Sequence, residues 1–320
     1  MKKNKIKDTG LEVTELSFGT SSLGSMPDTY GYEVSEDRAQ KTLNRFFQGP
    51  VNMLDTSRNY AMGESEKRIG RAIKENGGWP KGFLLSTKLD RNMDTLVLDK
   101  NRVRESFEES LKTLNVDSVD ILFLHDPEYA KDITDITKKD GAMDELFKIK
   151  NEGLAKAAGV AMGKVDIMFP LLKDWDFDVI INHNRYTLIN REANEMYDYA
   201  SSKNIAIFNA APYAGGVLAK GPDNFKKVTY QDATEEKLAP AREFEKVCKK
   251  HNVELGAAAL QFSLRDNRIT STICGVTSVE SIEKNLAWAN AEISGEFWDE
   301  VLKLPFSSND PESDRVFTAG

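Results

Sequence analysis

The sequence of 320 residues contains no long apolar run and no apolar block at its start. Its apolar stretches are short and interrupted by charged residues, whereas a membrane-spanning helix needs about 18 consecutive apolar residues. The first residues read MKKNKIK, which lacks the apolar segment of a secretory signal peptide. We therefore predict a cytoplasmic protein with no membrane partner.

Cysteine, histidine and net positive charge are also scarce. Cys248 and Cys274 lie in unrelated stretches, and the three histidines form no His-Glu-x-x-His motif, so we expect two buried reduced thiols and no protein-held metal. The 43 basic and 51 acidic side chains give a net charge of -8, which disfavours nucleic acid and anionic membranes as partners. We expect a small-molecule substrate and a monomer or small homo-oligomer.

Two common nucleotide-binding loops are missing as well. A Rossmann fold needs G-x-G-x-x-G directly after an early strand, and the sequence contains neither this run nor a Walker-type phosphate loop. There is no linker rich in Pro, Gly or Ser and no low-complexity tract. We predict one domain spanning residues 1–320.

The sequence does contain a repeated βα unit, in which short apolar runs alternate with helical patterns. The predicted strands are residues 16–19, 51–54, 83–88, 119–124, 154–160, 177–181, 205–210 and 272–275. The predicted helices are residues 35–47, 64–75, 100–114, 143–151, 164–173, 192–203, 235–250 with 255–264, and 279–289. Each predicted strand is followed by a helix.

Eight consecutive βα units close most simply into a (β/α)8 TIM barrel, an α/β fold that occupies about 250 residues. The remaining length is predicted to form an N-terminal β-hairpin, long βα loops and a C-terminal tail. The hairpin covers residues 2–13 and turns at residues 8–10. The loops cover residues 20–34, 125–141 and 211–234, and the tail follows residue 304.

Polar side chains follow three successive predicted strands. Asp55 and Tyr60 follow the second strand, Lys88 ends the third, and His125 follows the fourth. A TIM barrel carries its chemistry at the C-terminal ends of its strands, and neighbouring strands lie about 5 Å apart. We therefore expect these four side chains to meet at one point of the barrel mouth.

This set suits proton exchange with a carbonyl or alcohol oxygen, without a metal or a covalent nucleophile. A phenol titrates near about 10, and we expect Lys88 to lower the pKa of Tyr60, with Asp55 as the partner of the buried ammonium. His125 would orient the substrate oxygen. Each residue alone also has a structural interpretation, as an ion pair, a loop cap or a packing ring. Their conjunction at three strand ends favours a catalytic site.

These residues lie within a pattern that covers nearly the whole chain and resembles the aldo-keto reductase superfamily. The matching segments are LSFGT (16–20), NMLDTSRNY (52–60), GESEKRIGRA (63–72), STK (86–88), VDILFLH (119–125), GLAKAAGV (153–160) and AALQ (258–261). The resemblance implies nicotinamide-dependent interconversion of an alcohol or hemiacetal with a carbonyl. Tyr60 would exchange the proton while the cofactor exchanges the hydride.

Within the superfamily, the sequence is similar to the group of aldose 1-dehydrogenases, L-galactose dehydrogenase and pyridoxal dehydrogenase. The segments ILFLHDP (121–127), RYTL (185–188), NAAP (209–212) and GGVL (215–218) carry this similarity. It implies a sugar dehydrogenase of carbohydrate metabolism. The alternatives are an NADPH-dependent aldehyde or ketone reductase, a cofactor-sensing subunit with little turnover, and a barrel hydrolase or isomerase.

The resemblance also implies a set of cofactor contacts. They are Thr20, Asn182, His183, Gly275, Thr277, Ser278, Ser281 and Asn285. The segment 277–280 fits a capped helix start with free amides for a phosphate, and Asn285 corresponds to the adenine-side asparagine.

Departures from the family pattern bear on the cofactor. Relatives that use NADP carry a lysine or arginine where this chain has Gly275 and Ser281, so we predict NAD rather than NADP, although Lys284 is near enough to bind a phosphate. Relatives in the family hold the nicotinamide carboxamide with a Ser-Asn pair where this chain has Ala161 and Met162. They frequently carry a glycine after the tyrosine, where this chain has Ala61.

The substrate pocket is predicted to be walled by the long loops and the tail. Its candidate lining residues are Arg58, Tyr129, Arg185 and Tyr213. A polar wall that carries arginine suits a polyhydroxylated or anionic substrate.

Overall fold

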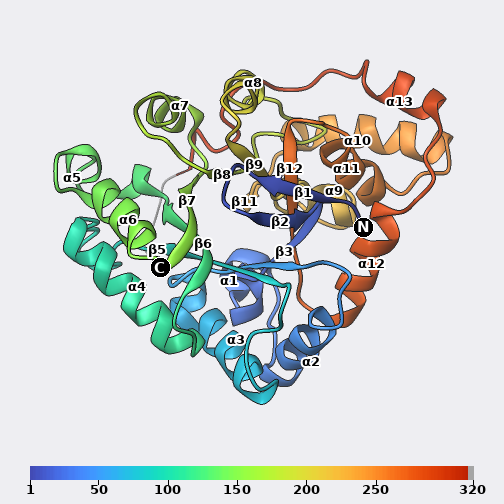
Figure 1. The fold of residues 1–320 in the computed structure, drawn as a ribbon. Coiled ribbons are helices and arrows are strands. Elements are labelled where there is room, and N and C mark those ends of the chain that lie inside the picture. The colour runs from blue at the N-terminus through green and yellow to red at the C-terminus, as the bar shows by residue number, and fades with distance from the viewer. Residues whose placement is uncertain (316–320) are drawn as a thin grey trace.

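The computed structural model describes residues 1–315 and contains a closed barrel of eight parallel strands, in the order β12-β3-β4-β5-β6-β7-β8-β9 (Figure 1). The strands are β3 (Leu16–Gly19), β4 (Met53–Asp55), β5 (Leu84–Leu89), β6 (Val119–His125), β7 (Ala155–Met162), β8 (Val179–His183), β9 (Ala206–Ala210) and β12 (Ile269–Gly275). This confirms the predicted (β/α)8 fold, with every strand within a few residues of its predicted place.

Helices surround the barrel as the hydrophobic period predicts (Figure 1). They are α2 (Glu36–Phe46), α3 (Glu64–Glu75), α4 (Lys100–Leu114), α6 (Ala142–Asn151), α7 (Val165–Asp174), α8 (Asn194–Ser202), α10 (Glu235–Lys250), α11 (Leu255–Leu264) and α12 (Val279–Ala289). One further helix, α13 (Gly295–Val301), lies in a segment for which no helix was predicted. Its Ser294 cap and the buried residues Phe297 and Trp298 explain why it forms.

The long loops contain short elements of their own. The first holds η1 (Ser21–Gly24) and α1 (Pro27–Tyr30), and the second holds η3 (Pro127–Tyr129) and α5 (Thr134–Thr137). The third holds η4 (Ala214–Gly216), α9 (Val217–Lys220) and the small β10 (Lys227–Val228) and β11 (Gln231–Asp232) pair, while η2 (Tyr60–Gly63) follows β4.

A β-hairpin covers the N-terminal end of the barrel, as predicted. Its strands are β1 (Lys3–Ile6) and β2 (Leu11–Thr14), drawn in dark blue in front of the barrel in Figure 1. Ile6, Leu11 and Val13 are buried in the same cluster as the residues that fill the barrel interior. The hairpin therefore closes this end, and the chemistry is left to the opposite end.

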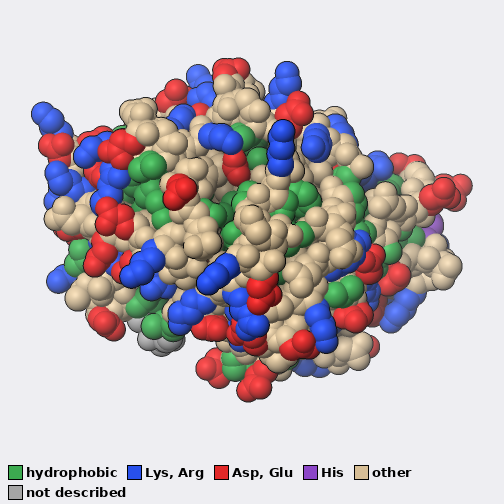
Figure 2. Space-filling view, turned by 60° about the horizontal axis from the view of Figure 1, so that its bottom comes forward, with side chains coloured by type: hydrophobic (Ala, Val, Ile, Leu, Met, Phe, Trp, Pro, Cys, Tyr) green, Lys and Arg blue, Asp and Glu red, His purple; other side chains and the backbone are tan. Residues whose placement is uncertain are grey.

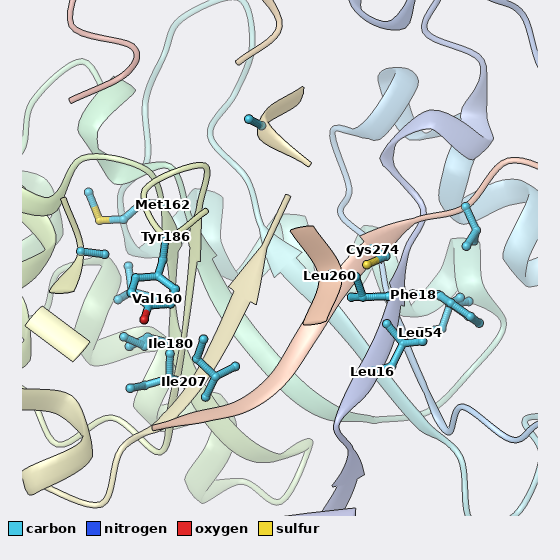
Figure 3. Packing of buried hydrophobic residues seen from close by; sticks show 14 of the residues in the cluster. Leu16, Phe18, Leu54, Val160, Met162, Ile180, Tyr186, Ile207, Leu260 and Cys274 are labelled. Carbon is cyan, nitrogen blue, oxygen red and sulfur yellow. The ribbon is translucent and has the colours of Figure 1, made fainter. Parts of the chain in front are cut away.

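Side chains alternate between the barrel interior and the layer beneath the helices. On β6, Ile121 and Phe123 belong to the interior cluster, whereas Leu122 and Leu124 belong to the outer layer. Figure 3 shows part of that outer layer, where Phe18, Leu54 and Leu260 pack between strands and helices. Cys248 and Cys274 are buried and unpaired.

The surface carries charges of both signs. Lys and Arg side chains are interspersed with Asp and Glu side chains over the face shown in Figure 2. Within residues 1–315, no helix has the length and apolar character needed to cross a membrane.

Glu66 is a buried acid that lies outside the barrel, between α3 and β5. Glu66 is fully buried and accepts a hydrogen bond from Thr87 Oγ1 at 2.7 Å. Burial raises the pKa of Glu66 to about 7, because poorly solvated surroundings disfavour the carboxylate. A carboxyl whose pKa rises on folding contributes stability below its unfolded pKa, and this contribution is lost as the pH rises through the folded value.

We therefore expect Glu66→Gln to raise the free energy of unfolding at pH 8 by about 2 to 3 kcal/mol, and by much less at pH 5. Urea unfolding of both proteins at the two pH values measures this difference. The matched control is Glu75→Gln on the same helix, where Glu75 is exposed. An effect of Glu66→Gln that does not change with pH would contradict the prediction.

Candidate active site

The polar residues of three adjacent strands point into the barrel mouth because they continue the inward-facing alternation. Met53 faces the interior on β4, so Asp55 does as well, and Leu84 on β5 is followed in phase by Lys88. On β6, His125 follows Phe123 in phase. The period of two therefore brings the side chains to one end of the barrel.

Lys88 lies at the centre of this group. Its Nζ lies 2.7 Å from Asp55 Oδ2, 2.6 Å from the carbonyl oxygen of Thr56 and 3.0 Å from Tyr60 Oη. Lys88 is 1% exposed and Asp55 is 4% exposed, so water does not separate the charges. The sequence placed these groups together, and the structure brings Asp55, Tyr60 and Lys88 into direct contact.

Hydroxyl groups hold Asp55 from the other side. Ser86 Oγ donates to Asp55 Oδ1 at 2.7 Å, so each carboxylate oxygen has its own partner. Thr20 is fully buried, and its amide and hydroxyl both donate to the Asp55 carbonyl oxygen, at 3.0 and 2.9 Å. Thr20 thus supports the end of β4.

Tyr60 is held by a tight loop. Ala61, Met62 and Gly63 follow it with φ values of 51°, 55° and 88°. Left-handed backbone is costly for residues other than glycine, so this loop stores strain that the surrounding structure must offset. Ala61 stands where the family pattern frequently has glycine, and it occupies one of these strained positions.

Arg58 supports this loop and does not form a free pocket wall. Its Nε donates to Glu109 Oε2 on α4 at 2.9 Å. An added Cβ at Gly63 would lie 2.0 Å from Arg58 Nη1, so the guanidinium packs directly beneath the loop. The expected role of Arg58 in lining the substrate pocket is therefore replaced by a role in holding the Tyr60 loop.

The expectation that Lys88 lowers the pKa of Tyr60 is wrong for the structure as it stands. Burial and then the Asp55 carboxylate raise the pKa of Tyr60 well above its ordinary value of 10. The physical reason is that Asp55 partly neutralises the field of Lys88 at the phenol, while burial removes the water that would solvate a phenolate. Tyr60 therefore holds its proton at neutral pH.

His125 is oriented by residues that the sequence argument missed. Its Nδ1 lies 2.6 Å from Asp90 Oδ1 and 3.1 Å from Ser57 Oγ, and Ser57 Oγ donates to Asp90 Oδ2 at 2.5 Å. The bond to Asp90 places the proton on Nδ1 and directs Nε2 to the other side of the ring. Asp90 follows Lys88 by two residues, so the same alternation could have identified it.

The charges around His125 favour its cationic form. Burial acts to lower its pKa, but Asp126 and Asp90 outweigh burial, so the pKa of His125 is raised. Burial acts to raise the pKa of Asp90. The charge of His125 and the hydrogen bonds that Asp90 accepts outweigh burial, so the pKa of Asp90 is lowered. The His125 and Tyr60 rings lie edge to face, 5.7 Å apart, so both can meet one substrate oxygen.

The two predicted cofactor residues on β8 face different surroundings. The Asn182 amide donates to the carbonyl oxygens of Met162 and Gly163 at 3.0 and 2.8 Å, which leaves its buried Oδ1 with no hydrogen-bond partner among residues 1–315. A carboxamide N–H of nicotinamide is a donor of the kind that this oxygen lacks. His183 faces the mouth, and burial lowers its pKa despite the nearby Glu312.

At the start of α12, the serines form a capping box. Ser278 Oγ accepts from the Ser281 amide, and Ser281 Oγ accepts from the amides of Thr277 and Ser278 at 2.9 and 3.0 Å. The expected free amides at 277 and 278 are therefore already satisfied. The first-turn amides of Val279 and Glu280 remain available to a phosphate by helix geometry. Gly275 ends β12 and is exposed.

Two further contacts lie at α12, one between Asn285 and Tyr213 and one between Thr277 and Arg38. Asn285 is buried, and its Oδ1 accepts from Tyr213 Oη at 2.5 Å, so Tyr213 lies on the side of the expected cofactor residues. Arg38 of α2 donates to Thr277 Oγ1 at 3.2 Å. This cation was not foreseen, because α2 and α12 are distant in the sequence.

Arg185 is 1% exposed and is committed to acidic residues. It donates to Glu312 and, at 2.5 Å, to Asp310 Oδ1. This ion cluster attaches the C-terminal tail to the segment after β8. Arg185 is therefore not available to an anionic substrate, which corrects the expectation from the sequence.

Tyr129 is half-buried on η3, beside Asp126. The guanidinium carbon of Arg91 lies 5.5 Å from the centre of the Tyr129 ring.

Comparisons with known proteins show the family to which the chain belongs. The model of the aldo/keto reductase family matches residues 15–304. L-galactose dehydrogenase of Arabidopsis thaliana is 31% identical over 88% of this chain and 85% of its own length. D-threo-aldose 1-dehydrogenase of a Pseudomonas species is 27% identical over 92% of this chain and 94% of its own. Pyridoxal 4-dehydrogenase of Microbacterium luteolum is 26% identical over 92% and 95%.

The fold also matches solved structures. An aldo-keto reductase from Bacillus halodurans, in its holo form, superposes with a TM-score of 0.77 over 99% of this chain and all of its own, at 22% identity. At this identity, the superposition supports the fold. The resemblance inferred from the sequence is thus confirmed at the level of the family.

The strained loop after Tyr60 yields a paired prediction. We expect Gly63→Ala to lower the free energy of unfolding by about 1 to 3 kcal/mol, because alanine at φ 88° is strained and its Cβ displaces Arg58. Turnover should fall as well, since Tyr60 moves with the loop. Urea unfolding and initial rates measure both effects. The matched reverse change, Ala61→Gly, should leave stability unchanged or raise it, and a loss of stability comparable to that of Gly63→Ala would refute the strain assigned to this loop.

Proposed function

Since the chain belongs to the aldo/keto reductase family, an oxidoreductase family, we propose that it interconverts an alcohol or sugar hemiacetal with a carbonyl or lactone. We propose a nicotinamide cofactor, with Tyr60 as general acid and base, and aldoses oxidised at C1 as the substrate class. The single observation that carries this proposal is the contact of Lys88 Nζ with Asp55 Oδ2 at 2.7 Å and Tyr60 Oη at 3.0 Å.

In the reducing direction, Tyr60 donates its proton to the substrate oxygen. Its raised pKa keeps this proton in place at neutral pH, and the nearby Lys88 ammonium stabilises the phenolate that donation leaves behind. His125, fixed by Asp90, presents Nε2 to the same oxygen and polarises it. In the oxidising direction, the phenolate accepts the proton, so oxidation is favoured as the pH rises.

The cofactor, when bound, supplies or accepts the hydride. Asn182 would receive the carboxamide N–H through its unpartnered Oδ1, and the first turn of α12 would receive a phosphate. The Tyr213 and Asn285 pair would border the adenosine side. Asn182 on β8, Tyr213 after β9 and the start of α12 are the residues that would hold the dinucleotide.

NAD is the proposed dinucleotide. Gly275 and Ser281 offer no cation to a 2'-phosphate, and Lys284 Nζ lies over the Trp288 ring at 4.6 Å. Arg38 is the cation that the structure adds next to Thr277, and it is exposed on α2. A single exposed guanidinium gives a 2'-phosphate less than the bidentate grip of a dedicated site.

The substrate class is supported by the relatives and by the polarity of the mouth. L-galactose dehydrogenase and D-threo-aldose 1-dehydrogenase are both named for aldoses. Around Tyr60, the structure places the Tyr30 hydroxyl, His183 and Asp126, all of which can hydrogen-bond sugar hydroxyls. Because the buried Arg185 is paired with Glu312 and Asp310, it offers no charge to an anion, and a neutral polyol is preferred as the substrate.

Tyr60→Phe tests the proposed function. We expect a loss of turnover of about 100-fold to 10 000-fold, because the proton donor is removed, with no change in the dissociation constant for NAD. Initial rates at the nicotinamide absorbance and titration of protein fluorescence measure the two quantities. Tyr199→Phe, a tyrosine of α8 far from the mouth, is the matched control and should turn over normally. Full activity of Tyr60→Phe would exclude the proposal.

The cofactor preference gives a further prediction. We expect NAD to bind more tightly than NADP, and we expect Arg38→Ala to weaken the residual binding of NADP by about 3-fold to 10-fold while leaving NAD binding nearly unchanged. Isothermal titration with each dinucleotide measures the dissociation constants. Lys284→Ala is the control and should affect neither. Tighter binding of NADP than of NAD would overturn the preference.

A further inference from the structure

Asp126 follows His125 at the end of β6 in a left-handed conformation. Its φ and ψ are 43° and 51°, in the left-handed region, and its amide donates to the Ala161 carbonyl oxygen at 2.8 Å. Residues other than glycine in this region commonly mark functional positions, because the surrounding structure has to offset the strain. The turn places the Asp126 carboxylate at the barrel mouth.

The carboxylate lies between two imidazole rings. Asp126 Oδ2 is 3.7 Å from His125 Nε2, and Asp126 Oδ1 is 4.0 Å from His183 Nε2. Both separations exceed a hydrogen bond, so neither ring satisfies the carboxylate. The two nitrogens and the two oxygens thus border a position that a small polar group can bridge.

One oxygen of this carboxylate is unpartnered. Asp126 Oδ1 is shielded from solvent and has no hydrogen-bond partner among residues 1–315. Leaving a buried acceptor unpaired is unfavourable, and native proteins seldom leave one without a reason. The unpaired acceptor indicates that a donor arrives with a ligand.

The neighbouring acids are engaged differently. Glu312 accepts hydrogen bonds from Arg185 and Arg315. Glu128 Oε1 accepts from the Gly163 amide at 3.1 Å, and burial beside Asp126 raises the pKa of Glu128 to about 8. Glu312 is already paired with arginine. Glu128 has one oxygen bonded to a backbone amide, and its Oε2 is buried without a hydrogen-bond partner among residues 1–315. Asp126 is the member of this group that faces both mouth histidines.

Asp126 is also close to the reacting groups. Its charge is among those that raise the pKa of Tyr60, so its field reaches the proton donor. Because Asp126 Oδ2 is 3.7 Å from His125 Nε2, a substrate whose carbonyl oxygen meets Tyr60 and His125 can bring its adjacent carbon near Asp126. A hydroxyl on that carbon can donate to the Asp126 carboxylate and accept from an imidazole N–H.

We propose that Asp126, together with His183, is the specificity-determining site for a hydroxyl group on the carbon next to the reacting carbon. This inference rests on the proposed function and narrows it to 2-hydroxy aldehydes and the aldoses that contain them. A carboxylate oxygen that is shielded from solvent and has no partner discriminates well, because an analogue without the hydroxyl leaves this oxygen unpaired. Asp126 acts by binding and does not exchange the proton.

The test uses 2-hydroxypropanal and propanal, which differ by one hydroxyl group, in reduction with NADH. The unaltered protein should favour 2-hydroxypropanal in kcat/KM by at least about tenfold. In Asp126→Asn, this ratio should fall towards one, mainly through a higher KM for 2-hydroxypropanal. A change in kcat that follows from the lost charge beside His125 and Tyr60 acts on both aldehydes and cancels in the ratio. Asparagine tolerates the left-handed backbone, so the variant is expected to fold.

Two further variants complete the experiment. Asp140→Asn is the matched control, since Asp140 is exposed in the same loop with φ 57°, and it should keep the ratio of the unaltered protein. Asp126→Glu keeps the charge but moves the oxygens, and it should also lose the preference. Thermal melting monitored by circular dichroism checks that each variant is folded.

The outcomes separate the two claims. If the unaltered protein shows no preference for 2-hydroxypropanal, or if Asp126→Asn keeps the preference, this inference is overturned while Tyr60→Phe can still support the proposed function. If Tyr60→Phe reduces both aldehydes at the normal rate, the proposed function fails and this inference fails with it.

Discussion

The buried contact between Lys88 and Asp55 is the constraint on which the site depends. An ammonium that is 1% exposed needs a carboxylate, and the 2.7 Å contact provides one. Buried ion pairs add little net stability, because desolvation offsets much of the attraction. What the pair supplies is position, since Lys88 can contact Tyr60 Oη at 3.0 Å only while Asp55 and the Thr56 carbonyl hold it.

The rest of the mouth is arranged around that pair by successive shells of hydrogen bonds. Ser86 and Thr20 support Asp55, while Asp90 and Ser57 support His125. Each reacting side chain therefore has a partner that fixes its orientation before a substrate arrives. Such preorganisation lowers the cost of reorganising charge during the reaction. It also explains why strain is tolerated in the loop after Tyr60.

Burial and neighbouring charges shift the pKa values of the titratable groups at the mouth in different directions. The raised pKa of Tyr60 keeps a proton ready for donation, and the raised pKa of His125 favours a cation beside the substrate oxygen. His183 has a lowered pKa, so it favours the neutral ring. Asp126 lies between a ring that tends to be charged and one that tends to be neutral, which suits a hydroxyl that both donates and accepts.

The sequence by itself determined the barrel, the hairpin and the meeting of Asp55, Tyr60, Lys88 and His125, because the period of two and the βα alternation are local properties that continue to the strand ends. The partner of Lys88 was predicted from the sequence, but only the tertiary structure decided the partners of Arg185 and Arg38. Arg185 donates a hydrogen bond to Glu312 of the tail, and Arg38 of α2 donates one to Thr277 before α12. Both contacts join segments that are distant in the sequence. The pKa of Tyr60 was likewise misjudged from sequence, because burial and opposing charges depend on the packing of the whole mouth.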